Sequence, residues 1–502
     1  MLSRKITVEM TPPSDQDMTD ASARLLALLP RELGPVQMDL SALRQLPEAC
    51  RAGEWTVTAT LSWTPSCYHV VALAPGRRDC SGYGIAIDLG STTVCGQLVN
   101  LETGDVVCQA SVYNQQIAFG EDILTRVFAC KDQPQKREEI RQATVSSICQ
   151  VMDALRERSG YAVETCGAMT VAGNTTMVHF LLGLDAFCVF AAPYAPWVTQ
   201  PEPMMAQSLG IDMAGYVYLY PCRANYLGGD IVSGIVATGM MEREKICVFL
   251  DIGTNGELVV GNRDFLLAGA GAAGPALEGG VVKTGMRAVD GAVSYVKLQD
   301  DRFTLTVIGG GAPRGLCGSG IVDLIAQLRL NGKIDLLGKF RREATLVEER
   351  NGELGIAYAP GLYFVQSDVD EFLRTKAAAN TMVEYMMDQI GMTMDDVDRF
   401  YVAGAFGAYL DQESAVTIGL YPDIPREKLC SAGNTSLEGA RMLLCRREIW
   451  LALPGILKTM EYIQFGEVAN FVDRMTAASA IPHTDMGRYP SVQRRLQQRG
   501  VQ

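Results

Sequence analysis

The feature of the sequence that most limits its fold is a pattern that occurs twice. Residues 84–100 read GIAIDLGSTTVCGQLVN, and residues 248–262 read VFLDIGTNGELVVGN. In each copy an apolar run typical of a β-strand ends in Asp-x-Gly-[Ser/Thr], and a second strand-like run follows. Because glycine after the aspartate permits a tight turn, each copy predicts a β-hairpin. A duplicated hairpin in turn predicts two halves of similar construction.

Helix-like stretches follow each hairpin. Strands that alternate with helices predict an α/β sheet in each half, and two similar halves predict a ligand cleft between them. Before the first hairpin, a helix signal at about 18–30, a strand-like run at 55–63 and the turn-rich segment APGRRDCSG indicate a separate module. The helices expected in the two halves lie at about 138–158, 174–183, 319–330 and 370–390. The expected parts are a small α/β domain over 1–80, halves over 81–245 and 246–478, and a polar tail over 479–502.

The overall composition excludes several classes of protein. With 44 Lys and Arg against 57 Asp and Glu, the net charge is −13, which argues against a nucleic-acid partner because such binding depends on basic side chains. The N-terminal segment lacks the apolar core of a signal peptide, and no apolar run reaches the ~18 residues of a membrane-spanning helix. We therefore expect a cytoplasmic protein with no membrane partner.

The cysteines and histidines form no recognisable metal-binding pattern. No two of the 14 cysteines lie within four residues of each other, whereas zinc and iron–sulfur sites usually include a close pair. The three histidines, His69, His179 and His483, are equally scattered. Free thiols are the expectation for a reducing compartment.

A hairpin of this type can bind phosphate. Its turn directs consecutive backbone N–H groups and Ser or Thr hydroxyls at one small volume, which forms an anion-binding nest. The aspartate before the turn can hold a hydrated Mg²⁺, so Asp88 and Asp251 are the predicted metal residues and candidate catalytic residues. An ordinary hairpin is the alternative for one copy, but two copies in register favour a polyphosphate ligand. The predicted phosphate-binding residues are Gly90, Ser91, Thr92 and Thr93 in the first copy and Gly253, Thr254, Asn255 and Gly256 in the second.

Two further glycine-rich segments are candidates for nucleotide contact. Residues 400–411 read FYVAGAFGAYLD, a strand followed by glycines that let the backbone approach a base or ribose, although a tight strand-to-helix turn is the alternative. In GLCGSG at 315–320, the N–H groups of Gly318 and Ser319 either meet a phosphate or ribose or only begin a helix, and both interpretations remain open. The candidate adenosine-binding residues are Gly404, Ala405, Phe406 and Gly407.

Two carboxylates that follow glycines are candidate catalytic groups. At Asp230 and Glu278 the backbone can come close to a ligand, and either carboxylate would orient water or a second Mg²⁺. A carboxylate that only stabilises a helix start is the alternative, and it remains open for both. We expect His179 to be an ordinary helix residue and Cys317 to be a small packed residue.

Taken in order, the two hairpins and the glycine-rich strand end resemble the phosphate-1, phosphate-2 and adenosine motifs of the actin, sugar-kinase and Hsp70 ATPase superfamily. A narrower resemblance is to the reductive activators of corrinoid proteins, and it runs from about Gly84 to about Phe471. It is carried by AGNTTMVHFLLGL (172–184), YLGGDIVSGI (226–235), AGAAGPALEGG (270–280) and VAGAFGAYLDQESA (402–415). The resemblance implies an α/β fold of two actin-like (ribonuclease-H-like) ATPase halves around a nucleotide cleft. Residues 1–80 are similar to the small α/β domain that precedes the ATPase part in that family.

The resemblance also implies a function. Members of this family use ATP to help the cobalt of a corrinoid protein return from Co(II) to Co(I). For this chain it implies an ATPase that binds ATP and Mg²⁺, acts on a corrinoid protein and forms a homodimer. A small-molecule kinase of the same superfamily and a non-catalytic ATP-gated binding protein are the alternatives.

The sequence departs from the family pattern in three places. Family members usually begin with a [2Fe–2S] domain of C-x-x-x-x-C-x-x-C spacing, whereas this chain has no cysteine before Cys50. We therefore expect no iron–sulfur cluster in this chain and an external ferredoxin-like electron donor. The family's N-P-Q is here Asn114-Gln115-Gln116, and its G-G-F-G-N is GAFGA at 404–408. Both changes are compatible with nucleotide binding.

Overall fold

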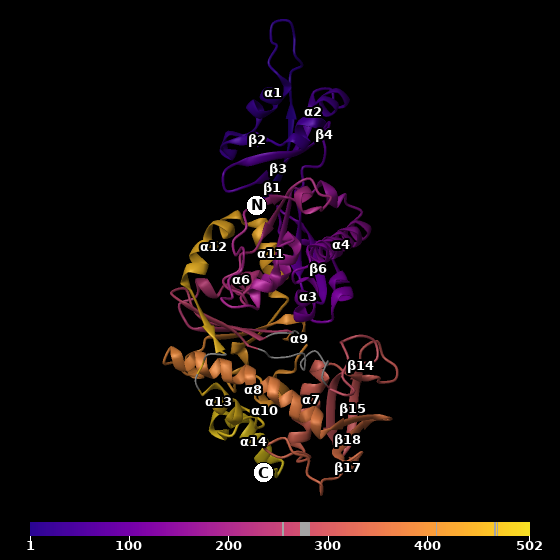
Figure 1. Cartoon of the computed structure of the whole chain (residues 1–502), viewed down its shortest axis with the longest axis vertical. Coiled ribbons are helices and arrows are strands. Elements are labelled where there is room, and N and C mark those ends of the chain that lie inside the picture. The colour runs from indigo at the N-terminus through magenta and orange to yellow at the C-terminus, as the bar shows by residue number, and fades with distance from the viewer. Residues whose placement is uncertain (254–255, 272–281, 408, 466–467, 469, 502) are drawn as a thin grey trace. The chain divides into compact units, whose positions relative to one another are not determined.

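The structure is a computed structural model that describes residues 1–253, 256–271, 282–407, 409–465, 468 and 470–501 (Figure 1). The chain forms two compact units. Each unit contains a six-stranded sheet with helices packed against it, so the predicted α/β class is confirmed. Unit 1 comprises Met1–Ala237 and Thr435–Lys458, and unit 2 comprises Thr238–Asn434 and Thr459–Gln502.

The first part of unit 1 is a four-stranded sheet with the strand order β1-β3-β4-β2. Its helix α2 packs on β4, and the buried side chains of β3 and β4 supply much of its core. The helix and strand expected near 18–30 and 55–63 are confirmed as α1 and β3. The elements are β1 (Ser3–Glu9), α1 (Ala21–Leu28), β2 (Val36–Met38), α2 (Leu40–Ala52), β3 (Thr56–Trp63) and β4 (Tyr68–Pro75).

The larger sheet of unit 1 has the order β7-β6-β5-β8-β10-β9. The first predicted hairpin is β5 and β6, which continue into β7 as an antiparallel meander. On the other side of β5, β8 and then β10 lie parallel to it. The strands are β5 (Tyr83–Leu89), β6 (Thr93–Asn100), β7 (Val106–Tyr113), β8 (Ala168–Gly173), β9 (Met204–Met205) and β10 (Tyr216–Leu219).

Helices cover both faces of this sheet. They are α3 (Ile123–Cys130), α4 (Pro134–Ser159), α5 (Thr175–Leu182), α6 (Gly229–Thr238), α11 (Thr435–Cys445) and α12 (Arg447–Thr459). A Cβ added to Gly96 would touch Val151 of α4, and one added to Gly84 would touch Leu444 of α11. Because the register puts Gly84 and Gly96 on opposite faces, α4 and α11 also lie on opposite faces. Asp88 shares the α11 face with Gly84, since side chains alternate along a strand.

The six-stranded sheet of unit 2 repeats this arrangement in five of its strands. Its order is β21-β20-β11-β12-β13-β22, with β11, β12 and β13 as an antiparallel meander and β20 and β21 parallel beside β11. The order of these five strands is the same in both sheets, which confirms the predicted duplication of an α/β half; the sixth strand differs, since β9 is antiparallel beside β10 whereas β22 is parallel beside β13. The strands are β11 (Cys247–Ile252), β12 (Gly256–Gly261), β13 (Leu266–Gly271), β20 (Arg399–Ala403), β21 (Leu429–Gly433) and β22 (Met460–Gln464).

Unit 2 also carries two three-stranded sheets, β15-β14-β16 and β17-β18-β19. Its core reaches into the segment 479–502, where Tyr489, Val492 and Leu496 are buried. The strands are β14 (Ala292–Gln299), β15 (Arg302–Val307), β16 (Gly315–Leu316), β17 (Val347–Arg350), β18 (Glu353–Ala359) and β19 (Leu362–Val365). The helices are α7 (Gly318–Leu330), α8 (Gln366–Gln389), α9 (Gly404–Gly407), α10 (Gln412–Ile418), α13 (Phe471–Ala478) and α14 (Pro490–Gln498).

The four helices expected in the two halves are present as α4, α5, α7 and α8. Their ends differ from the expected ones by at most a few residues, which is usual because helix ends depend on local capping. None of the helices in the described ranges is long and apolar enough to cross a membrane.

Candidate functional site

The turn of the first hairpin is held by side chains from the segment that follows the meander. Asn114 Nδ2 donates to the carbonyl of Gly90 at 2.9 Å, and the Asn114 amide donates to the carbonyl of Thr92 at 2.9 Å. Between them, Arg126 Nη1 donates to the carbonyl of Ser91 at 2.6 Å. All three carbonyls of the turn are therefore directed at Asn114 and Arg126.

These contacts fix the direction of the N–H groups in the turn. In a trans peptide, the carbonyl and the N–H of the next residue point in opposite directions. The amides of Ser91, Thr92 and Thr93 therefore face away from Arg126. A row of amides with one common direction, next to three hydroxyls, can bind an anion.

Arg126 itself is fully buried. Its guanidinium also donates to the carbonyls of Gly120 at 2.9 Å and Glu121 at 3.2 Å, and to Gln116 Oε1 at 3.3 Å. Burial lowers the pKa of Arg126, and these hydrogen-bond acceptors stabilise the positive charge of its guanidinium group. Because a buried cation without acceptors would be costly, the Ser91 carbonyl cannot turn away without a large loss of stability.

Three polar side chains from separate segments meet where β5 ends. Ser436 Oγ, at the start of α11, donates to Asp88 Oδ1 at 2.8 Å. Burial raises the pKa of Asp230, at the start of α6, to about 7; the Asp88 carboxylate adds to the rise, and a 2.9 Å hydrogen bond from the Ile231 amide opposes it. The structure thus brings together Asp88 and Asp230, two of the predicted catalytic residues.

This pair of carboxylates fits a hydrated cation. Asp88 and Asp230 are both partly buried and repel each other, and a divalent cation would relieve that repulsion. Mg²⁺ in proteins usually takes one or two carboxylates and keeps several waters. Across the described residues, no three His, Cys, Asp or Glu side chains gather as a larger metal site. The donor set therefore matches Mg²⁺ rather than an ion ligated wholly by protein.

Glycine is required where α6 begins. A Cβ on Gly228 would lie 2.4 Å from Cα of Asn174 and 2.7 Å from Asp230 Oδ1. This close approach places the end of β8 next to the start of α6. The segments 172–184 and 226–235, two of the segments that carry the family resemblance, therefore lie against each other next to Asp230.

In unit 2 the second hairpin brings Asp251 against the glycine-rich strand end. Asp251 pairs with Ala403 of β20, and a Cβ on Gly404 would lie 2.5 Å from the carbonyl oxygen of Ile252 and 3.0 Å from Asp251 Oδ1. Gly404 also has φ of +88°, a conformation that residues with a side chain disfavour. Two motifs that were predicted separately thus meet in unit 2.

Glu257 is a carboxylate that the sequence analysis missed. It is the cross-strand partner of Asp251, so both side chains project from the same face of the hairpin, and Glu257 is only 9% exposed. The sequence does contain a signal for Glu257. In a hairpin whose turn is centred in DIGTNGE, the first and last residues of this segment, Asp251 and Glu257, are cross-strand partners. Asn114 was noted only as a departure from the family. No local signal identifies Arg126 or Ser436, since their contacts depend on residues far away in the sequence.

Gly253 and Gly256 flank the turn of the second hairpin, as expected. The carbonyl of Gly407 accepts a 2.9 Å hydrogen bond from Ser431 Oγ on β21. The predicted residues that lie outside the described part are Thr254, Asn255 and Glu278, together with the side chains of Ala405 and Phe406.

Gly318 and Ser319 begin α7 and are buried. Ser319 Oγ donates to the carbonyl of Ser294 on β14 at 2.9 Å, and Cys317 Sγ lies 3.3 Å from the carbonyl of Val293. The hydroxyl is therefore used within the fold, which supports the helix-start interpretation. A role of these residues in nucleotide contact stays a prediction.

His179 is packed as a structural residue. It is fully buried, its Nδ1 lies 2.8 Å from the carbonyl of Thr175, and its Nε2 accepts a hydrogen bond from the Trp197 amide at 3.2 Å. Burial lowers the pKa of His179, so the neutral ring is favoured. Both ring nitrogens are occupied, as expected for an ordinary helix histidine.

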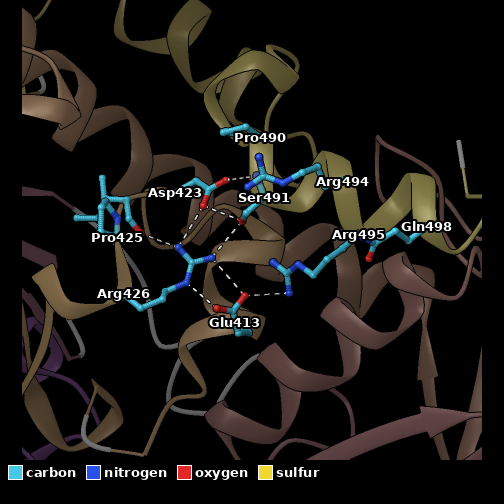
Figure 2. A pocket seen from close by; sticks show the side chains of 10 residues that line it. Glu413, Asp423, Pro425, Arg426, Pro490, Ser491, Arg494, Arg495 and Gln498 are labelled. Carbon is cyan, nitrogen blue, oxygen red and sulfur yellow. Dashed lines mark hydrogen bonds and ion pairs between the residues drawn. The ribbon is translucent and has the colours of Figure 1, made fainter.

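An open pocket of about 500 Å³ in unit 2 is lined by charged side chains that pair with one another. Figure 2 shows Arg426 between Glu413 at 2.6 Å and Asp423 at 3.1 Å. Arg495 also reaches Glu413 at 3.1 Å, and the amide and hydroxyl of Ser491 both donate to Asp423 at 2.7 Å. Because Ser491 and Arg495 belong to α14, these contacts attach that helix to the rest of the unit, and the pocket is not a candidate nucleotide site.

Three models of known protein families match consecutive parts of the chain. They are the RACo linker region over 2–79, the RACo middle region over 83–243, and the C-terminal domain of RACo, its ASKHA domain, over 245–493. The chain is 32% identical over 401 residues to the corrinoid activation enzyme RamQ of Eubacterium limosum, covering 76% of this chain and 67% of that protein. It is 24% identical over 407 residues to a [Co(II) methylated amine-specific corrinoid protein] reductase of Methanosarcina barkeri, covering 73% and 70%. Among solved structures, a reductive activator for a corrinoid, iron–sulfur protein matches with a TM-score of 0.87 and 35% identity, over 98% of this chain and 80% of that one.

Proposed function

The chain belongs to the RACo family, and on that basis we propose that it is an ATP-dependent reductive activator of a corrinoid protein. It binds Mg·ATP, hydrolyses it, and helps the cobalt of its partner return from Co(II) to Co(I). A separate ferredoxin-like donor provides the electrons. The protein acts in the cytoplasm as a homodimer.

The proposal rests most directly on the arrangement around Asp88. A carboxylate pair that fits a hydrated Mg²⁺ lies in the same unit as the turn whose amides of Ser91, Thr92 and Thr93 share one direction. Phosphate and Mg²⁺ are bound together by just these two kinds of group in ATP-binding proteins. An ordinary hairpin would not need a carboxylate pair nearby, and a carboxylate that only stabilises a helix start would not need such a turn. The two alternatives therefore do not explain why both features occur in one unit.

The roles of the residues follow from their positions. Bound Mg²⁺ supplies positive charge that neutralises the phosphate oxygens. Asp88, fixed by Ser436, would hold the water shell of the ion, and the amides of Ser91 to Thr93 would hold phosphate oxygens. Asp230, whose carboxylate lies near that of Asp88, would orient the attacking water and accept its proton.

ATP can drive the partner's reduction only through a difference in binding. A conformational change shifts the redox equilibrium of the cobalt by as much as the two states of the complex differ in binding free energy. Each tenfold shift requires about 1.4 kcal/mol. The hairpins in units 1 and 2 are the elements through which nucleotide binding would bias these two states.

Steady-state ATP turnover tests the proposal. The purified protein is assayed alone, with a Co(II) corrinoid protein, and with a panel of polyols and sugars. We expect turnover to rise with the corrinoid protein and to be unaffected by the polyols. Stimulation by a polyol alone would instead identify a small-molecule kinase, and ATP binding without turnover in any mixture would identify an ATP-gated binding protein.

A further inference from the structure

A second cluster of reactive side chains lies in unit 1, away from the Asp88 hairpin. Cys67 closes the turn between β3 and β4, and His69 follows two positions later on β4. The turn places the Cys67 thiol beside the His69 imidazole. Asp39, which follows β2, and Tyr216, which begins β10, complete the cluster.

The distances in the cluster form a continuous relay. Cys67 Sγ lies 3.4 Å from His69 Nε2, and His69 Nδ1 lies 2.8 Å from Asp39 Oδ1. The hydroxyl of Tyr216 donates to Asp39 Oδ2 at 3.2 Å. Nucleophile, base and orienting carboxylate are therefore arranged in the order that activates a nucleophilic side chain.

The Asp39 side chain bonds to His69 and Tyr216 and does not cap the helix that follows it. It occupies the N-cap position of α2, where an aspartate usually accepts a hydrogen bond from the first turn, yet it makes no such side-chain bond. Its two oxygens are directed to His69 and Tyr216 instead. Since a helix cap is itself stabilising, its absence here indicates that the bonds to His69 and Tyr216 are the more favourable use of the carboxylate.

The carboxylate determines how the imidazole is protonated. Because an ionised carboxylate only accepts hydrogen bonds, His69 Nδ1 carries the hydrogen that it donates to Asp39. His69 Nε2 is then an acceptor and faces the sulfur of Cys67. The thiol proton can pass to Nε2, which leaves a thiolate beside an imidazolium.

The other buried cysteines lack this arrangement. Burial raises the pKa of Cys166 and Cys222 to about 12, so these thiols stay protonated and unreactive. Cys80 is exposed, and its sulfur lies 3.3 Å from the hydroxyl of Thr7 rather than beside an imidazole. All 14 cysteines are free thiols, so reactivity rather than pairing distinguishes Cys67.

We propose that Cys67 is a peroxide-reactive thiol, with His69 as its base and Asp39 as a positioning residue. The Cys67 thiolate attacks one oxygen of a hydroperoxide, an S–O bond forms and the O–O bond breaks. The departing oxygen takes the proton from His69 Nε2. The sulfur is oxidised by two electrons to a sulfenic acid, and the hydroperoxide is reduced to water or an alcohol.

Access to the sulfur selects the oxidant. Cys67 is only 7% exposed, so a bulky disulfide cannot attack its sulfur without movement of the turn, whereas a small hydroperoxide needs the least room. The turn is itself fixed, because the Thr64 hydroxyl donates to the carbonyl of Cys67 at 2.9 Å and the Thr64 amide donates there at 2.8 Å.

The oxidised sulfur would act on a junction within unit 1. His69 and Asp39 belong to the four-stranded sheet, whereas Tyr216 belongs to β10 of the larger sheet, and the His69 and Tyr216 rings lie 5.2 Å apart. An oxygen atom added to Cys67 occupies space beside His69 and replaces the thiol hydrogen bond. Oxidation of Cys67 would therefore change the contact between His69 and Tyr216, and through Tyr216 it would affect the sheet that contains Asp88.

Sulfenic-acid trapping tests this proposal on the full-length protein. The protein is treated with a few equivalents of hydrogen peroxide for timed intervals, the peroxide is quenched, and the protein is unfolded in dimedone so that trapping does not depend on access to each sulfur; each cysteine peptide is then quantified by mass spectrometry. Proton removal by a positioned base accelerates reactions by roughly 10²- to 10⁴-fold, so we expect Cys67 to be labelled at least about tenfold faster than the exposed Cys80. Labelling of Cys67 no faster than Cys80 in the unmodified protein would overturn the proposal without need of any variant.

Two variants separate a base from a structural contact. His69→Asn is expected to reduce the labelling rate of Cys67 at least about tenfold, and Asp39→Asn is expected to reduce it less, while Cys80 is labelled as before. Far-ultraviolet circular dichroism confirms that each variant is folded. If Cys67 reacts at the unmodified rate in folded His69→Asn, the imidazole is not its base and the proposal is wrong. These readouts need neither ATP nor a corrinoid protein, so they are independent of the proposed function.

Discussion

The guanidinium of Arg126 donates a 2.6 Å hydrogen bond to the carbonyl of Ser91, so a fully buried cation supports the turn of the first hairpin. Because the Asn114 side chain and amide bind the carbonyls on either side of Ser91, the turn has one orientation only. Its amides are thereby fixed before any ligand arrives, which lowers the entropy cost of binding a phosphate.

Replacement of Arg126 tests this support. We expect Arg126→Met to raise the Kd for ATP at least about tenfold, since the Ser91 carbonyl is released and the amides lose their common direction. The free energy of unfolding should fall by about 3 kcal/mol because several buried carbonyls lose their donor. Titration calorimetry and urea unfolding measure the two effects. Arg158→Met, an exposed residue of the same region on α4, serves as the control; an unchanged Kd for ATP in folded Arg126→Met would contradict the assigned role.

Asp230 gives a pH-dependent stability effect whose sign is fixed by its pKa. The pKa of about 7 lies above the ordinary value of 3.8, so the native state binds this proton more tightly than the unfolded state does. Its contribution to stability is fully present below pH 3.8 and is lost as pH rises through 7. Asp230→Asn should therefore raise the free energy of unfolding at pH 8 in metal-free buffer, on the order of 2 kcal/mol, and change it little near pH 4.

The same variant should lose activity while it gains stability. If Asp230 accepts the proton of the attacking water, Asp230→Asn lowers the rate of ATP hydrolysis by about 10²- to 10⁴-fold. Asp105→Asn, at an exposed carboxylate of unit 1, is the control for both measurements. Equal stability of Asp230→Asn and the unmodified protein at pH 8 would show that burial and the Asp88 carboxylate do not destabilise the charged form of Asp230.

Gly404 has no room for a side chain beside Asp251. We expect Gly404→Ala to lower the free energy of unfolding by about 2 kcal/mol or more, because its Cβ would meet the Ile252 carbonyl oxygen at 2.5 Å and its φ is +88°. Gly391→Ala is the matched control, since Gly391 has φ of +65° with no atom within 4 Å of the added Cβ. Thermal unfolding of both variants separates the clash from the backbone strain, and a cost for Gly404→Ala no larger than that for Gly391→Ala would contradict the contact.

Lys376 ties the segment after α13 to α8. It is fully buried, and Nζ donates to the carbonyls of Ala478 and Ala480 at 2.6 Å each and to that of Pro482. Lys376→Met leaves these carbonyls without their donor, so we expect the free energy of unfolding at pH 6 to fall by about 2–4 kcal/mol. Lys297→Met, at an exposed strand position, should change it by less than about 0.5 kcal/mol in the same urea titration. A similar small change for Lys376→Met would mean that water replaces the ammonium group.

The strand and helix pattern of this chain could be predicted from its sequence because local signals determine it. Both hairpins are marked by glycine after an apolar run, and α4, α5, α7 and α8 by apolar periodicity. Residues 479–502 are polar on average, yet Val492 and Leu496, one helical turn apart, are buried in unit 2. The average composition of a segment does not indicate such an apolar stripe, whereas the helical spacing of its apolar residues does.

The candidate site could be predicted only in part. Asp88, Asp230 and the first turn were identified from their glycine neighbours, and the structure brings the two carboxylates together. Ser436 reaches Asp88 from a helix that lies 348 residues later in the sequence, so its contact depends on how α11 packs. The contact of Cys67 with His69 follows no known metal-binding or catalytic sequence spacing, so the sequence alone does not indicate it. Asp39 joins them through the parallel pairing of β2 with β4, which no local pattern indicates.

The central claim is tested most directly by ATP-dependent formation of Co(I). A Co(II) corrinoid protein is mixed with this protein and a low-potential ferredoxin-type donor under anaerobic conditions, and the cobalt absorbance is followed with ATP, with ADP and without nucleotide. The account predicts that Co(I) accumulates with Mg·ATP, that it does not accumulate with ADP, and that Asp88→Asn removes the effect of ATP. An equal yield of Co(I) with and without ATP would contradict it.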